Sequence, residues 1–147
     1  MDLFDAIERR HSYRGGYTGS PVPRADLEKI VMAGIRAPSG HNAQTTSFVI
    51  VDEPELLSQV LACVSTADYL DGAGAAIVAV MDPAPSPGKK HAFGVEDCAA
   101  AVENMLLAIT AMGYASVWID GALRTVGADA EIARLLRVPD HLRVRVL

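Results

Sequence analysis

The residues best suited to chemistry gather in short polar stretches of the chain. The first, Arg10 to Arg14, reads Arg-His-Ser-Tyr-Arg and places two guanidinium groups and a hydroxyl within five residues. A guanidinium fork matches the geometry of a phosphate, and a serine hydroxyl adds a further donor. A fixed cation can also stabilise negative charge on an electron-poor ring. On spacing alone, the arginine pair is also compatible with a solvated surface that complements the dipole of a preceding helix.

The second stretch, Pro38 to Gln44, follows a predicted helix and begins a turn. Ser39 and Asn42 offer compact polar groups there, and Gly40 allows close approach of the backbone. These residue types are also what an ordinary loop after a helix contains. The stretch is therefore either a binding turn or a plain helix-terminating loop.

A predicted strand that ends in Asp120 and Gly121 is the third candidate. Ligands of α/β proteins gather beyond the carboxyl ends of strands, where a turn can direct a backbone N–H at a bound ring. An ordinary strand-to-loop transition with Trp118 in the core would explain the same residues.

Helical periodicity and breaker residues predict the elements that must position these groups. Helices are expected over residues 2–10, from Pro23 to just before Pro38, from Pro54 onward, over residues 95–112 and over residues 129–137; strands are expected over residues 48–51, 75–81, 115–119 and 142–147, with a turn at Asp120-Gly121 and a mobile surface loop at 82–90. This order predicts one α/β (α+β) domain over residues 1–147, with a central mixed sheet flanked by helices.

The helix expected over residues 95–112 is apolar nearly all round. Such a helix is buried on more than one side. In a chain of this length a partner subunit is the natural second cover, so the sequence predicts a homodimer.

Composition narrows the class of protein. The chain has 147 residues and a net charge of -5, with acids and bases interspersed, whereas a nucleic-acid surface needs a basic patch. Cys63, Cys98 and the scattered histidines form no zinc or disulfide pattern. The N-terminus lacks the features of a signal peptide, and the most apolar run, residues 72–81, is too short to span a bilayer. We therefore expect a cytoplasmic protein that contacts neither nucleic acid nor membrane and holds no metal.

Four motifs in order resemble the nitroreductase family of FMN enzymes. They are Arg10-His11-Ser12-x-Arg14, Ala37-Pro38-Ser39-x-x-Asn42-x-Gln44, the apolar helix from Glu96 to Leu107, and the segment from Met112 to Gly121. The resemblance covers essentially the whole chain. It implies an FMN-binding fold and an intertwined homodimer in which both subunits contribute to each site.

The resemblance also implies which residues hold FMN. Arg10 and Ser12, with His11 between them, would hold the ribityl-phosphate, and Arg14 would face the pyrimidine edge of the ring, where the family often has lysine. The other implied contacts are Pro38, Ser39, Gly40 and Asn42, which would reach the FMN of the other subunit, and Asp120 and Gly121, which would lie by the hydride-accepting N5 with a backbone N–H directed at it. Asp71 falls near a further family contact to the flavin.

The implied reaction takes hydride from NAD(P)H and passes it to an electron-poor acceptor, such as a nitroaromatic or a quinone, in a ping-pong sequence. No side chain need act as a nucleophile. Tyr69, Phe93 and the 82–90 loop are candidates for acceptor contacts. Alternatives are reduction of an enoate, a halogenated aromatic or a flavin, an FMN-binding protein without turnover, and a purely structural dimer.

Three departures from the family pattern stand out. Thr45-Thr46 replace the Pro-Trp that usually follows Gln44, which changes the wall of the pocket. The region between the second strand and the long helix is short, so an open site is expected. The family's closing basic pair, which grips the FMN phosphate, and its crossing tail lie beyond Leu147, so we expect the natural chain to continue past this residue.

Overall fold

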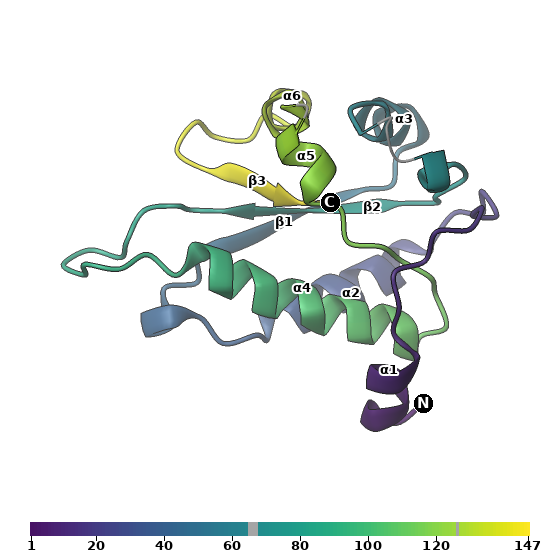
Figure 1. Ribbon diagram of the computed structural model, residues 1–147, viewed down its shortest axis with the longest axis horizontal. Coiled ribbons are helices and arrows are strands. Elements are labelled where there is room, and N and C mark those ends of the chain that lie inside the picture. Colours follow the sequence, from purple (N-terminus) through teal and green to yellow (C-terminus); the bar gives the residue numbers. More distant parts are fainter. Residues whose placement is uncertain (65–67, 126) are drawn as a thin grey trace.

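The computed structural model describes residues 1–64, 68–125 and 127–147, and its elements form three layers (Figure 1). A three-stranded sheet forms the middle layer. Its faces are covered by α3 (Pro54–Ala62), α5 (Gly121–Thr125) and α6 (Ala128–Leu135) on one side and by α2 (Arg24–Ile35) and α4 (Gly94–Ala111) on the other, while α1 (Leu3–Arg9) projects beside the C-terminal end of α4. The expected sheet flanked by helices is therefore confirmed.

Local signals set the helix boundaries. Asp2 caps α1 by accepting a hydrogen bond from a backbone N–H of the first turn, and Glu53 caps α3 by accepting two such bonds. Pro54 occupies the first turn of α3, where its missing N–H costs nothing. Helix α2 begins after Pro23, and α4 ends before Gly113, whose φ of 83° favours glycine.

The sheet contains β1 (Thr46–Val51), β2 (Ala76–Met81) and β3 (Arg143–Val146) in the order β1-β2-β3. Both pairings are antiparallel, with Val51 opposite Ala76, so the expectation of a mixed sheet is wrong for the described residues. The chain re-enters the sheet beside the point where β1 leaves it, and β2 must therefore run back along β1.

Residues 115–119 do not form the expected strand. Ile119 exchanges two backbone hydrogen bonds with Leu147, at 2.8 and 3.0 Å, and Ser116 accepts one from the N–H of Tyr13 at 2.9 Å. A strand is defined by a regular series of backbone hydrogen bonds to its neighbour, and these isolated contacts do not form one. The turn expected at Asp120-Gly121 is instead the start of α5.

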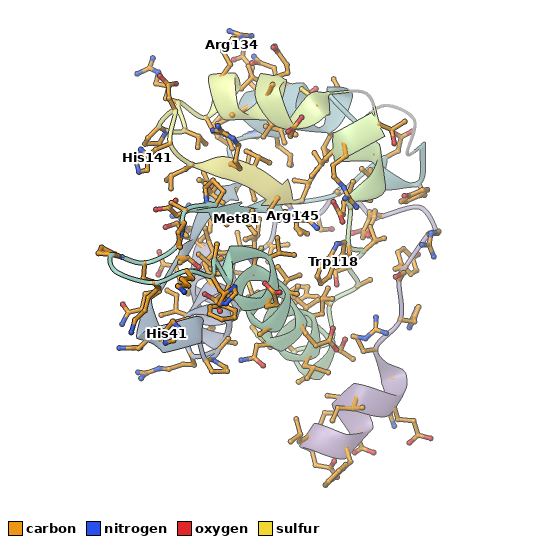
Figure 2. All side chains as sticks on the ribbon, turned by 60° about the vertical axis from the view of Figure 1, so that its left-hand side comes forward. His41, Met81, Trp118, Arg134, His141 and Arg145 are labelled. Atoms are coloured by element: carbon orange, nitrogen blue, oxygen red, sulfur yellow. The ribbon has the colours of Figure 1, made fainter. Side chains whose placement is uncertain are left out.

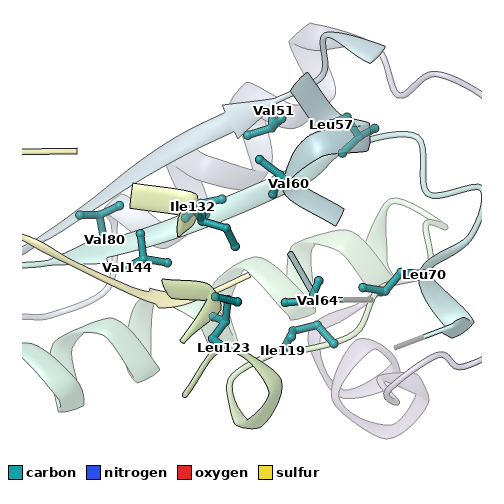
Figure 3. Close-up of a cluster of buried hydrophobic side chains, with 12 residues drawn as sticks. Val51, Leu57, Val60, Val64, Leu70, Val80, Ile119, Leu123, Ile132 and Val144 are labelled. Atoms are coloured by element: carbon teal, nitrogen blue, oxygen red, sulfur yellow. The ribbon is translucent and has the colours of Figure 1, made fainter. Parts of the chain in front are cut away.

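Two hydrophobic clusters lie on opposite faces of the sheet. The first joins α3, α5 and α6 to the sheet and includes Val60 and Ile132 (Figure 3). The second joins α2 and α4 to the other face. Strand β2 contributes Val78 to the first cluster and Ala79 to the second, because successive side chains of a strand point to opposite faces. This explains why β2 is apolar throughout.

Strand β3 carries a β-bulge that reorients its side chains. Val80 pairs with Val144, whereas the preceding Ala79 pairs with Val146, so Arg145 is the extra residue. Val144 and Val146 consequently pack on opposite faces of the sheet, although strict alternation would place them on the same face. The bulge also directs Arg145 toward the residues after α4.

Helix α4 is covered by the sheet on one side and by α2 on another. The apolar sequence of α4 requires burial on more than one side. Helix α2 of the same chain therefore provides part of that burial. No helix in the described ranges, α4 included, combines the length and hydropathy needed to cross a bilayer.

Candidate functional site

Backbone contacts fix the Arg10–Arg14 segment where it leaves α1. The N–H of Tyr13 donates to the carbonyl oxygen of Ser116 at 2.9 Å, and the N–H of Tyr17 donates to that of Asp71 at 3.2 Å. The fold thus brings Tyr13 of the first candidate stretch beside Ser116, four residues before Asp120, and the chain after that stretch beside Asp71.

The two arginines of this segment make only weak contacts with the residues that the structure describes. The Nε of Arg10 lies 3.6 Å from Oε1 of Glu103, and both side chains are partly exposed. The guanidinium carbon of Arg14 lies 5.8 Å from the ring centroid of Tyr69, within the range of a cation–π contact. Such exposed contacts contribute little to stability. The fold therefore does not account for two arginines at these positions.

Ser12 and His11 complete the segment. Ser12 is half-buried, and its hydroxyl makes no hydrogen bond in the described part of the chain; His11 is exposed, with Nδ1 2.9 Å from the carbonyl oxygen of Arg9. A hydroxyl without an internal partner, flanked by two weakly engaged guanidinium groups, is a donor set suited to a phosphate. The segment fits the phosphate end of FMN.

The turn after Pro38 has an unusual backbone. His41, Asn42 and Gln44 have φ values of 56°, 54° and 53°, in the left-handed region that disfavours residues with a side chain. The hydroxyl of Ser39 accepts a hydrogen bond from the N–H of Gln44 at 3.0 Å and closes the turn. Three left-handed residues within four positions require support from outside the turn.

Asp97, a buried carboxylate that sequence analysis did not single out, provides that support. It lies in the first turn of α4 and is 6% exposed. Its Oδ1 accepts a hydrogen bond from the N–H of Gly40 at 2.7 Å, and its Oδ2 accepts one from the hydroxyl of Thr45 at 2.9 Å. One feature of the sequence could have indicated this role. Asp97 lies one helical turn before Ala101 on the buried face of α4, and a buried carboxylate needs hydrogen-bond donors.

Phe93 packs against the same turn. A Cβ on Gly40 would overlap the Phe93 ring, and the His41 ring lies edge-on to it with the centroids 5.5 Å apart. Glycine is therefore required at position 40. Of the single residues proposed for acceptor contacts, Phe93 lies at this turn and Tyr69 lies at Arg14.

Two arginines enclose Asp120 beyond α4. Arg145, the bulge residue, contacts Oδ1, and Nη2 of Arg124 donates to Oδ2 at 2.9 Å. The Asp120 side chain is 17% exposed. Because its carboxylate is already paired, the groups left to face a ligand are in the backbone. The N–H of Gly121, the first residue of α5, has no acceptor within the helix, and the space at its Cα is open.

A single chain does not bring all the candidate residues together. Figure 1 shows α1 and the segment after it at the C-terminal end of α4, whereas residues 38–44 lie at its N-terminal end. Figure 2 shows His41, in this turn, apart from Trp118, which follows α4 in the sequence. Helix α4 has 18 residues and is about 27 Å long. The Pro38–Asn42 contacts thus cannot complete the Arg10–Arg14 site within one chain.

The chain also contains a largely apolar cavity of about 420 Å³. Its lining includes Ile77 of β2, Val102 and Ile109 of α4, and Val117 and Trp118. The side chains expected to hold FMN, all of them in the described ranges, are absent from this lining. We therefore do not assign the cavity to the cofactor.

Both cysteines are free thiols, and Cys98 is buried near Arg145. Burial, opposed by the positive charge of Arg145, raises the pKa of the Cys98 thiol to about 11. The thiol is therefore protonated at neutral pH and unsuited to act as a nucleophile.

Comparison with known proteins connects these features to a family. The model of the nitroreductase family matches residues 7–67 and 58–147. A protein of Archaeoglobus fulgidus, provisionally named NADH dehydrogenase/NAD(P)H nitroreductase, is 34% identical over 128 residues, which cover 87% of this chain and 72% of the relative. The chain therefore belongs to the nitroreductase family, a family of oxidoreductases, as its motifs predict.

Solved structures show the same fold. An FMN-dependent nitroreductase of Clostridium difficile R20291 superposes with a TM-score of 0.82 at 28% identity, over 97% of this chain and 83% of the other. A nitroreductase of Bacteroides fragilis NCTC 9343, solved with bound FMN, superposes with a TM-score of 0.76 at 28% identity, over 99% and 85% of the two chains. The nitroreductase-like fold is thus confirmed.

Proposed function

We propose that this protein is a homodimeric, FMN-dependent reductase that takes hydride from NAD(P)H and passes it to nitroaromatics, quinones or similar electron-poor acceptors. Family membership and the FMN bound by the Bacteroides fragilis relative support the cofactor. The observation that carries the proposal is the separation of the Arg10–Arg14 segment from the 38–44 turn. Each half of the expected site is incomplete in one chain, and a second copy would supply the other half.

The exposed apolar surface supports a second copy. Phe4 of α1 is 80% exposed, and the other strongly exposed large apolar side chains of the described residues lie at the N-terminus, on α1, on α2 or at the start of α4. These are Met1, Leu3, Ile7, Met32, Ile35 and Val95. Apolar surface gathered on one group of helices is typical of an interface. We infer that the partner subunit covers it.

In the proposed site, Arg10 and Ser12 hold the phosphate of FMN, with His11 beside them. Arg14 keeps a positive charge at the pyrimidine edge, where it stabilises negative charge that builds up on reduction. The Tyr69 ring restrains the Arg14 guanidinium on one side. The chain thus supplies a cation at each end of the cofactor.

The partner's turn completes the site. Pro38, Ser39, Gly40 and Asn42 contact the FMN held by the other subunit, and the stiffness of the turn orients them. On the first subunit, the N–H of Gly121 would be the donor offered to the flavin ring, and Arg124 and Arg145 engage the carboxylate of Asp120.

Bound FMN would supply the hydride chemistry, with NAD(P)H and the acceptor occupying the same place in turn, as a ping-pong sequence requires. The residues of the chain bind and orient, and no side chain is needed as a nucleophile or a general base. The protonated Cys98 thiol agrees with this assignment.

Anaerobic titration of the flavin-loaded protein tests the proposal. NADH or NADPH should bleach the flavin absorbance within one turnover, and a quinone should restore it. Flavin that stays oxidised under both nicotinamides would instead identify a binding protein without turnover. Protein that takes up no FMN would contradict the proposal altogether.

A further inference from the structure

Asp97 connects the first turn of α4 to both ends of the tight turn. Its two carboxylate oxygens are engaged separately, one by the N–H of Gly40 at 2.7 Å and the other by the hydroxyl of Thr45 at 2.9 Å. With 6% of its surface exposed, this carboxylate depends on those donors and on the positive end of the α4 dipole. The carboxylate therefore fixes the two anchor points relative to the helix.

The residues between the two anchors do not favour the observed conformation. His41, Asn42 and Gln44 all have left-handed backbones, which residues with a side chain adopt reluctantly. Such a conformation persists only where surrounding contacts determine it. Within the turn, Ser39 accepts a hydrogen bond from Gln44, and the side chain of Gln44 donates a weak one to Asn42 at 3.4 Å. Asp97 and Thr45 link the turn to α4, beside the packing of Phe93.

We propose that Asp97 and Thr45 are positioning residues that hold this turn in the conformation that presents Ser39, Gly40 and Asn42 to FMN. The proposal rests on the proposed function, since it assigns these two side chains a role in the same site. Neither side chain needs to touch the cofactor. Loss of the Thr45–Asp97 hydrogen bond removes a side-chain anchor at one end of the turn, where the backbone of Thr45 still accepts a hydrogen bond from Asp82. The fraction of molecules in the binding-competent conformation falls as a result.

Thr45→Val tests the proposal, because valine keeps the branched shape and removes the donor. Ser47→Ala is the control: Ser47 lies two residues further along, in β1, its side chain is exposed, and it has no assigned role in the site. Loss of a hydrogen bond to a charged group corresponds to a change of about tenfold or more. We expect T45V to speed hydrogen exchange in residues 39–45 of the flavin-free protein and to raise the FMN dissociation constant, each about tenfold. S47A should change neither.

Thr45→Ser retains the hydroxyl and should restore both the exchange rate and the affinity. If T45V does not fold, T45S still decides the matter, because a tenfold weaker affinity in T45S would contradict a role for the hydroxyl. Wild-type exchange in T45V would overturn the anchoring, and faster exchange with unchanged FMN affinity would overturn the positioning role. A wild-type protein that binds no FMN would instead refute the proposed function, so the two failures are distinguishable.

Discussion

Arg10→Ala should separate cofactor affinity from fold stability. Among the described residues, Arg10 makes one ion pair, with its Nε 3.6 Å from Glu103 and the two side chains 32% and 51% exposed. Exposed pairs of this kind contribute about 0–1 kcal/mol. The substitution should therefore change the free energy of unfolding of the flavin-free protein by less than about 1 kcal/mol.

The expected effect on FMN binding is larger. A charge-assisted hydrogen bond contributes about 1.5–3 kcal/mol, which corresponds to a rise in the dissociation constant of roughly 10- to 150-fold. Fluorescence titration measures this constant, and chemical denaturation of the flavin-free protein measures the stability. Riboflavin lacks the phosphate, so R10A should weaken its binding far less than that of FMN.

Arg9→Ala provides the control. Arg9 is the neighbouring, exposed arginine in the last turn of α1 and is not assigned to the site. R9A should bind FMN as tightly as the wild type. The phosphate assignment would be refuted if R10A lost no FMN affinity, or if its affinities for FMN and riboflavin fell by the same factor.

Three further substitutions test other parts of the structure. Arg14→Ala should lower the reduction potential of bound flavin and slow hydride uptake, as spectroelectrochemistry and stopped-flow absorbance would show; no change in either would contradict its electrostatic role. Ile132→Ala removes a side chain that is 0% exposed and should cost about 2–5 kcal/mol of unfolding free energy in a denaturant titration, and a loss below 1 kcal/mol would argue against close packing there. Two backbone N–H groups lower the pKa of Glu53 from its usual 4.5, so its contribution to stability is present above that pH and is lost as pH falls through the lowered value. Glu53→Gln should therefore flatten the acid side of the melting-temperature profile, and an unchanged profile would exclude this cap as a cause of acid sensitivity.

Most elements could be predicted because their signals are local. Pro23 and Pro38 bracket α2, and Gly113 follows the end of α4 as its left-handed backbone requires. The apolar run over β2 indicated a strand covered on both faces, and Val78 and Ala79 confirm it. Such features depend on residues close together in the sequence.

Features that depend on distant partners could not be predicted. The β-bulge at Arg145 arises from the pairing of β3 with β2, and nothing in the alternation of residues 143–146 indicates it. The predicted strand at 115–119 has the right residue types, but among the described residues only Ile119 exchanges hydrogen bonds with a partner, Leu147. The helix expected over residues 2–10 is present as α1, but the sequence did not indicate that its Phe4 would be exposed in the single chain.

In the candidate site, too, local features could be predicted and features that depend on distant residues could not. The polar stretches at 10–14 and 38–44 stand out by composition, but their separation along α4 emerges only from the fold. The role of Asp97 could not be predicted, because the groups that donate hydrogen bonds to it, on Gly40 and Thr45, lie more than fifty residues away in the sequence.

Native mass spectrometry of the protein loaded with FMN tests the central claim most directly, because it weighs the chain and its cofactor together. A species of two chains with two FMN molecules is the predicted result. A single chain that retains FMN would show that one copy suffices, and a dimer that never acquires FMN would show that the interface holds no cofactor; either result would contradict a site shared between subunits.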